Sequence, residues 1–191
     1  MEINKYDLFK QRIENLSEHF AIVESDGNIT PQQEDLIRAF VLLCHAEIEN
    51  YIEDLATELL ENGKERWDTQ KTANYNIASL FIESEKIEKN LDTNQKSLQL
   101  FSQFRSVIKN NHGIKLHNIK KLFTPLGYAL DDFDNLFITE LSTFGELRGE
   151  TAHTSANTQI QNILNFNDVK IKVDHIVTEL QTFKNVLHSK V

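Results

Sequence analysis

The sequence is poor in residues that break helices and in residues that cross-link a chain. Its 191 residues include only two prolines and six glycines. So few breakers favour long helices over a protein with many strands and turns. The one cysteine, Cys44, has no second thiol with which to form an internal disulfide. These shortages exclude a small disulfide-stabilised module and favour an all-α fold.

Long hydrophobic runs are also missing. The longest unbroken apolar stretch, Ala39 to Cys44, is far too short to cross a bilayer. The first residues lack the basic start and the apolar core of a signal peptide. The sequence therefore predicts a cytoplasmic protein that does not use a membrane as a partner.

Acidic residues outnumber basic ones, and the formal net charge of −9 argues against nucleic acid as a partner of the whole surface. The basic residues are unevenly distributed, however. The segment 93–130 has no Asp or Glu and contains the cations Lys96, Arg105, Lys109, Lys115, Lys120 and Lys121. This segment predicts a surface that holds a phosphate chain, although lysines that only solvate helix surfaces explain it equally well.

Apolar residues recur every three or four positions along almost the whole chain, which is typical of amphipathic helices. We expect a first helix over 6–24 and a long one from Pro31 to about Asn62, ended by Gly63. The other helices are expected near 75–82, 93–109 and 116–123, from Asp131, and after a cap at Asn167. The prediction is an all-α bundle of six to seven helices.

The helix expected from Asp131 has a charged residue where its periodicity requires an apolar one. Its apolar residues are Phe133, Phe137, Leu141 and Phe144. The next position on that face is Arg148, and a buried guanidinium is costly unless an anion meets it. His153 follows five residues later, a spacing that turns two side chains about 140° apart on a straight helix. The long arginine side chain, Gly149 or a two-fold axis would each allow the pair to converge.

Simpler interpretations of both residues remain open. Arg148 would then pair with an acid of a neighbouring helix, and His153 would make only a local hydrogen bond.

Four stretches of the sequence resemble the HEPN superfamily. Arg148 and His153, separated by four residues at the end of a late helix, resemble its Rx4–6H motif. Residues 40–51, in which Glu49 precedes Tyr51, resemble its second helix. Residues 111–115, 126–127 and 148–154 resemble the RiboL-PSP-HEPN branch, and within it the proteins described as MAE_28990- or MAE_18760-like. The resemblance implies a single HEPN-like domain over 1–191, with a core of about 30–186 and the helix 6–24 packed on it.

The resemblance also implies a function and partners. Many HEPN proteins are homodimers whose two motifs line one cleft, and they cleave RNA without a metal or cofactor as toxins or phage-defence nucleases. A cognate antitoxin protein is then a further partner. RNA supplies its own nucleophile, the 2′-hydroxyl. His153 would move the proton, and Arg148 would hold the non-bridging phosphate oxygens with its two-pronged guanidinium.

Further residues join this expected site. Glu49 is the third catalytic candidate, because a carboxylate near the motif would orient its arginine or histidine. Glu47 competes for that role, since it lies nearer the apolar stripe of the same helix. The residues expected to contact RNA are Lys109, His112, Lys115, Lys120 and Lys121. His112 and His117 have no acid or thiol nearby, so no metal site is expected.

The residues next to the motif, Gly149 and Thr154, also bear on its function. Many HEPN motifs have a polar residue directly after the arginine, where this sequence has Gly149. Thr154 follows the histidine, and the tyrosine that nucleotidyltransferase antitoxins modify is absent from residues 154–156. A HEPN dimer that binds RNA, a nucleotide or a protein without cleaving is therefore the second hypothesis, and a helical scaffold is the third.

Overall fold

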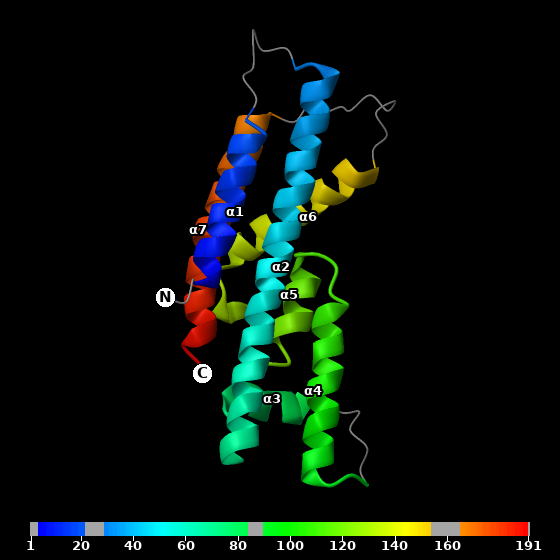
Figure 1. Cartoon of the computed structure of the whole chain (residues 1–191), viewed down its shortest axis with the longest axis vertical. Coiled ribbons are helices and arrows are strands. Elements are labelled where there is room, and N and C mark those ends of the chain that lie inside the picture. Colours follow the sequence, from blue (N-terminus) through cyan, green and yellow to red (C-terminus); the bar gives the residue numbers. More distant parts are fainter. Residues whose placement is uncertain (1–3, 22–28, 84–89, 154–164, 191) are drawn as a thin grey trace.

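The computed structural model describes residues 4–21, 29–83, 90–153 and 165–190, and for His153 it describes the backbone only. These ranges contain no strand. Their elements are α1 (Lys5–His19), α2 (Pro31–Gln70), α3 (Tyr75–Glu83), α4 (Thr93–Lys109), α5 (Leu116–Phe123), the 3-10 turn η1 (Leu130–Asp132), α6 (Asn135–His153) and α7 (Phe166–His188). The all-α prediction is confirmed for this part of the chain (Figure 1).

The 40-residue helix α2 is the axis of the fold, and it runs the length of the molecule in Figure 1. It begins as expected, because the Thr30 hydroxyl accepts from the Gln33 N–H while the Gln33 side chain accepts from the Thr30 N–H. Every other α-helix contacts it. Its buried face supplies much of the core through Ile37, Phe40, Val41, Cys44, Ile48, Ile52, Leu55, Ala56, Leu59 and Leu60.

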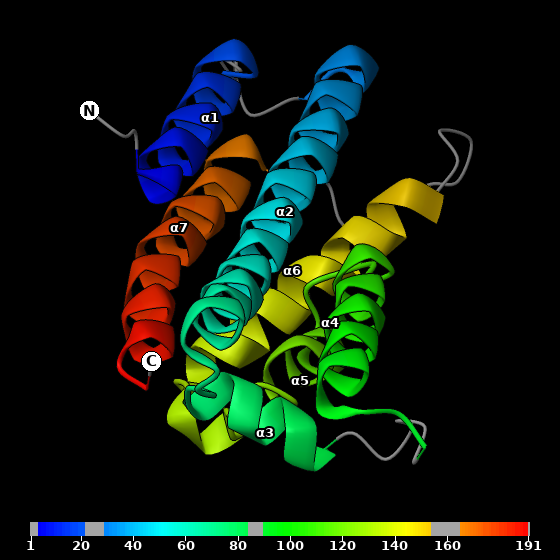
Figure 2. The same ribbon diagram turned by 60° about the horizontal axis from the view of Figure 1, so that its bottom comes forward.

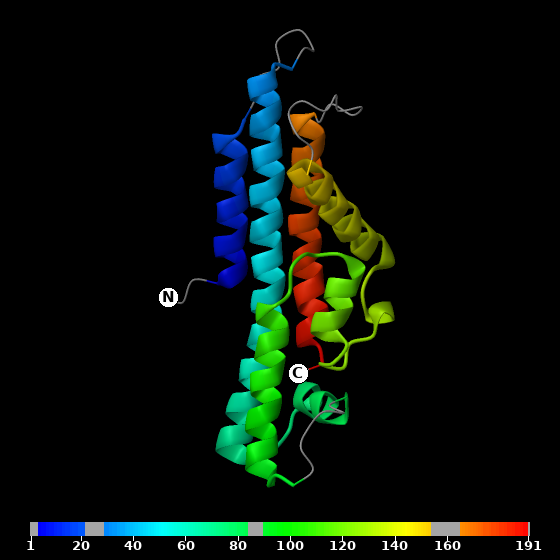
Figure 3. The same cartoon turned by 90° about the vertical axis from the view of Figure 1, so that its right-hand side faces the viewer.

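Helices α1 and α7 run alongside α2, while α6 crosses this group obliquely (Figure 3). The contact between α1 and α2 includes the rings of Phe9 and Tyr51, which stack with centroids 4.5 Å apart. The Tyr6 hydroxyl donates to the Val177 carbonyl oxygen of α7 over 3.0 Å. In the part of the chain that the structure describes, no helix is both long and apolar enough to cross a membrane.

The prediction that Gly63 ends the long helix is wrong. Helix α2 continues to Gln70 and ends at Lys71, whose φ of 55° is left-handed. Gly63 is buried where α3 packs against α2, and a Cβ atom there would overlap the Ile77 side chain, lying 2.7 Å from its Cδ1 atom. Glycine therefore permits a close approach of two helices at this position rather than a helix end.

Helix α6 begins four residues later than expected. Residues from Leu130 to Asp132 form a separate 3-10 turn, and the Asp134 carboxylate then accepts from the N–H groups of Leu136 and Phe137. Those two N–H groups have no partner within a helix, so the carboxylate determines where α6 begins.

The boundaries of α1 and α7 also differ from those expected. Helix α1 ends at His19 rather than at 24, and residues 22–24 lie outside the described residues. The cap of α7 is Asn165, whose side chain accepts from the Asp168 N–H over 3.1 Å, and not Asn167.

Candidate functional site

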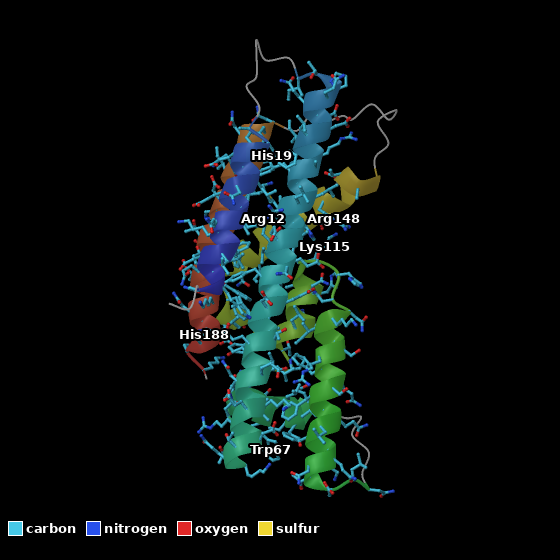
Figure 4. All side chains as sticks on the ribbon, in the orientation of Figure 1. Arg12, His19, Trp67, Lys115, Arg148 and His188 are labelled. Carbon is cyan, nitrogen blue, oxygen red and sulfur yellow. The ribbon has the colours of Figure 1, made fainter. Side chains whose placement is uncertain are left out.

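A pocket of about 370 Å³ lies where α2, the connection between α4 and α5, and α6 meet. It is lined by His45 and Glu49 of α2, by residues 112–115, His117 and Asn118, and by Gly145, Arg148 and Gly149 of α6. In Figure 4 the side chains of Arg148 and Lys115 lie close together beside α2. Three segments far apart in the sequence thus contribute to one site.

Hydrogen bonds from α2 hold the connection between α4 and α5 in place. The Gly113 N–H donates to the Glu49 carboxylate. Asn111 donates through its side-chain amide to the Glu53 carboxylate over 3.0 Å and accepts from the Asn118 amide over 3.0 Å. The φ of Gly113 is +127°, a conformation that residues with a Cβ rarely adopt. This network fixes the backbone of one wall of the pocket.

That wall carries the side chains of Lys115 and of two histidines, His112 and His117. The Lys115 side chain crosses α6 at Gly145, where an added Cβ atom would lie 3.0 Å from the Lys115 Cγ atom. Its ammonium group is 4.0 Å from a Glu146 carboxylate oxygen, which is a loose ion pair. Most of the positive charge of Lys115 therefore remains available at the pocket.

Arg148 continues the apolar face of α6 in helical phase, but its side chain is exposed and not buried in the core. Helix α6 buries Phe137, Leu141 and Phe144, but its last turns extend past α2, away from α1 and α7 (Figures 1 and 2). The face of α6 that is buried at Phe144 therefore lines the pocket, and not the core, at Arg148. Within the described ranges no carboxylate lies within 4.0 Å of this guanidinium, so the pairing with an acid of a neighbouring helix is not seen there.

His45 is the functional candidate that the sequence did not reveal. Its side chain is only 3% exposed, and its ring lies against Phe144 with centroids 6.2 Å apart. The Nδ1 atom is 3.5 Å from a Glu49 carboxylate oxygen. Burial, followed by the positive charge of Arg148, lowers the pKa of His45 to about 4. His45 is therefore neutral at physiological pH.

The family model named RiboL-PSP-HEPN matches residues 7–189, which is nearly the whole chain and includes the pocket. The chain belongs to the RiboL-PSP-HEPN family. No curated protein and no solved structure matches it. Domains of HEPN type commonly form dimers and bind RNA. The match does not distinguish the narrower branch named from the sequence, which stays a prediction.

The pocket of this RiboL-PSP-HEPN chain contains Glu49 and not Glu47. Glu49 lies between His45 and Gly113, whereas the Glu47 carboxylate accepts from Arg12 of α1 over 3.0 Å. Glu49 is thus the carboxylate near Arg148, and its catalytic role stays a prediction.

The family motif is only partly described. His153 is the last residue of α6, but its side chain and Thr154 lie outside what the structure describes. Gly149 lines the pocket, and apart from its chain neighbours and the nearby backbone of α6, no described atom would lie within 4 Å of a Cβ added there. The polar residue that often stands at this position in HEPN proteins would therefore fit without a clash.

Three of the expected RNA contacts lie outside the pocket. Lys109, Lys120 and Lys121 do not line it, and the Lys121 ammonium donates to the Asn110 carbonyl oxygen over 3.1 Å. Arg105 of the same basic segment binds Glu61 through two hydrogen bonds of 2.7 Å. Only His112 and Lys115 of the expected RNA contacts share the pocket with Arg148.

Neighbouring groups do not assemble a metal site in the described ranges. No three side chains of His, Cys, Asp or Glu there are grouped as metal ligands would be. Cys44, next to His45 in sequence, is buried, and burial raises the pKa of its thiol, which opposes formation of a nucleophilic thiolate.

Proposed function

We propose that this protein is a metal-independent endoribonuclease of HEPN type that binds RNA at the Arg148 pocket and cleaves it by attack of the 2′-hydroxyl. The observation that supports this most is the exposed Arg148 guanidinium, which faces a pocket and has no carboxylate partner among the described residues. A phosphate group would supply the missing anion. Membership in a family of HEPN type supports the same choice of ligand.

Each residue type suits one part of the reaction. Arg148 would bind two non-bridging phosphate oxygens and offset the charge that develops in the pentavalent transition state. Lys115 and His112, on the opposite wall, would hold the neighbouring phosphates. His153 would transfer a proton at the leaving group. Proton transfer of this kind contributes about 10²- to 10⁴-fold, and a fixed cation contributes a similar factor.

We propose that the active form is a homodimer. A two-fold axis would bring the second copies of Arg148 and His153 to the same cleft, because each subunit presents the end of α6 away from its own core. A dimer of this kind would also extend the binding surface along the RNA.

Cleavage of single-stranded RNA in the presence of EDTA tests the proposal. The purified protein should leave 2′,3′-cyclic phosphate ends, and DNA of the same sequence should remain intact because it has no 2′-hydroxyl. Arg148→Ala and His153→Ala should each abolish cutting while the circular dichroism spectrum is unchanged. Arg105→Ala is the matched control, since it removes an arginine that lies outside the pocket. Undiminished cutting by both motif variants would contradict the proposal.

The biological setting we propose is a toxin or phage-defence nuclease that a cognate antitoxin protein restrains. Expression of the wild-type chain should then arrest growth, and expression of His153→Ala should not. Growth that is equally slow with both would point away from RNA cleavage as the cause.

A second candidate function is a HEPN dimer that binds RNA, a nucleotide or a protein without cleaving it. Gly149 favours it, because the residue after Arg148 offers no side-chain ligand to a phosphate. Binding that weakens steeply with salt while the RNA stays intact would identify this function.

A further inference from the structure

His45 and Glu49 form a carboxylate–imidazole pair at the pocket that contains Arg148. They are four residues apart on α2, so both side chains reach the same side of the helix. We propose that His45, oriented by Glu49, accepts the proton of the RNA 2′-hydroxyl at this pocket. The assignment rests on the proposed nuclease function, and it gives each subunit a base that does not come from the Rx4–6H motif.

The two contacts of Glu49 explain how the imidazole would be oriented. One carboxylate oxygen accepts the Gly113 N–H, which fixes the carboxylate, and the other lies 3.5 Å from His45 Nδ1. A carboxylate at Nδ1 favours the tautomer with its proton on that nitrogen and leaves the lone pair on Nε2. A base oriented by a third group in this way is the usual arrangement in enzymes that activate a hydroxyl, and its hydrogen bonds are often long before substrate binds.

The charges around His45 keep it able to accept a proton. Glu49 faces it from α2, Arg148 from α6, and His112, Lys115 and His117 surround the same pocket from the connection and α5. Burial and the charge of Arg148 lower the pKa of His45 to about 4, so the free imidazole is unprotonated at neutral pH. A phosphate bound to Arg148 would offset the positive charge of that residue, which would raise the pKa of His45 and make the imidazole a stronger base when RNA is present.

The proposed step is balanced within the site. The 2′-hydroxyl proton moves to Nε2 of His45 as the 2′-oxygen forms its bond to phosphorus. The bond from phosphorus to the 5′-oxygen breaks, and that oxygen takes a proton from a protonated imidazole, which we assign to His153. The products are a 2′,3′-cyclic phosphate and a 5′-hydroxyl; His45 then releases its proton to water, and His153 takes a proton from water.

The first test is His45→Asn. The asparagine amide still offers an N–H donor to Glu49, but the substitution removes the Nε2 lone pair that would accept the proton. We expect RNA cleavage to fall about 10²- to 10⁴-fold, the usual contribution of a positioned base, while the Kd for RNA changes less than about threefold. His188→Asn is the matched control, because His188 also faces a carboxylate, that of Glu58 at 3.3 Å, and lies far from Arg148 in Figure 4. It should cut RNA at the wild-type rate.

Chemical rescue separates a base from a space-filling side chain. His45→Ala should regain part of its cleavage rate when imidazole is added. Pyrazole has nearly the same shape but is a much weaker base, so it should not restore the rate. Equal rescue by both compounds would assign His45 a structural role and overturn the proposal.

The pH profile of the wild-type protein tests the proposal without any variant. If His45 is the base, kcat at saturating RNA should not fall from pH 7 to pH 5.5, because His45 keeps its lone pair while His153 gains its proton. A base with the ordinary imidazole pKa of about 6.5 would instead lose about tenfold of its unprotonated form over that interval, which outweighs the gain at His153, so kcat would fall. Such a loss, or wild-type cutting by folded His45→Asn, would remove His45 from the mechanism and leave the nuclease function intact. If the wild-type protein does not cut RNA while it remains folded, both proposals fail.

Discussion

The backbone N–H of Gly113 donates a hydrogen bond to the carboxylate of Glu49, which joins the connection between α4 and α5 to the middle of α2. Together with the bond from Asn111 to Glu53, it links two of the three segments that line the pocket. Glu49 therefore has a structural role at the site whatever its catalytic one, and substitution of this residue should affect both stability and the shape of the pocket.

We predict that Glu49→Ala destabilises the protein by about 1–3 kcal/mol, the usual cost when a hydrogen bond to a charged group is lost and its partner is left unsatisfied. Glu49→Gln should cost less, since its carbonyl oxygen still accepts from Gly113. The measurement is the free energy of unfolding in urea for each variant at pH 7.

Glu47→Ala is the control for this series. Glu47 lies two residues away on the same helix and pairs with Arg12, whose side chain is 51% exposed. Exposed pairs of this kind contribute at most about 1 kcal/mol. Equal losses of stability in Glu47→Ala and Glu49→Ala would show that the contact with Gly113 has no special weight.

Two glycines in helices should respond in opposite directions to alanine. Gly149 lies inside α6 with open space around it, so Gly149→Ala should stabilise the protein by about 0.5–1 kcal/mol through better helix propensity. Gly63→Ala should destabilise it by about 1–3 kcal/mol, because the new methyl group would overlap Ile77. Thermal unfolding checks both variants. A fall in Tm for Gly149→Ala would mean that α6 does not continue through this position in solution.

Periodicity and caps were good guides to helices whose ends are determined locally. The helix from Thr93 to Lys109 has the expected bounds because Asp92 and Gln95 form a capping box at its start and Asn110 follows its end. Gly63 does not end α2, and the reason is non-local. The sequence shows a glycine, but only the packing of α3 against α2 explains why no side chain fits there.

The site was predictable only in part, for a similar reason. The helical phase of α6 singles out Arg148. Its exposure, however, depends on where α6 leaves the core, and the sequence pattern does not give that position. His45 lies on the buried side of α2, where a histidine looks like a core residue. Its spacing of four from Glu49 was the one available signal. The importance of that pair emerges only when α6 brings Arg148 to the same pocket.

The proposed phosphate contact of Arg148 predicts a change in the salt dependence of RNA binding. For single-stranded RNA, each neutralised phosphate contributes about −0.7 to the slope of log K against log salt. Arg148→Ala should therefore weaken binding for all sequences and reduce the slope by about 0.7. Arg105→Ala should change neither, because that guanidinium already binds Glu61. Fluorescence anisotropy between about 50 and 300 mM salt, over which the Debye length falls from roughly 14 Å to roughly 6 Å, measures both slopes. An unchanged slope in Arg148→Ala would exclude a phosphate contact at this residue.

The low pKa of His45 predicts a specific pH dependence of stability. The pKa of His45 is lowered to about 4 in the folded protein, whereas an unfolded chain binds the proton near pH 6.5. Between these values the unfolded state binds more protons, so the contribution of His45 is fully present above about pH 6.5 and is lost as the pH falls toward 4. The whole loss is on the order of 3 kcal/mol.

His45→Asn has no such group, so the difference in unfolding free energy between it and the wild-type protein should shrink steadily from pH 7 to pH 4.5. His188→Asn, which alters an exposed histidine, provides the comparison for general effects of acid. A difference that stays constant with pH would mean that the imidazole of His45 titrates normally in the folded state and is not held in a buried, neutral form beside Arg148.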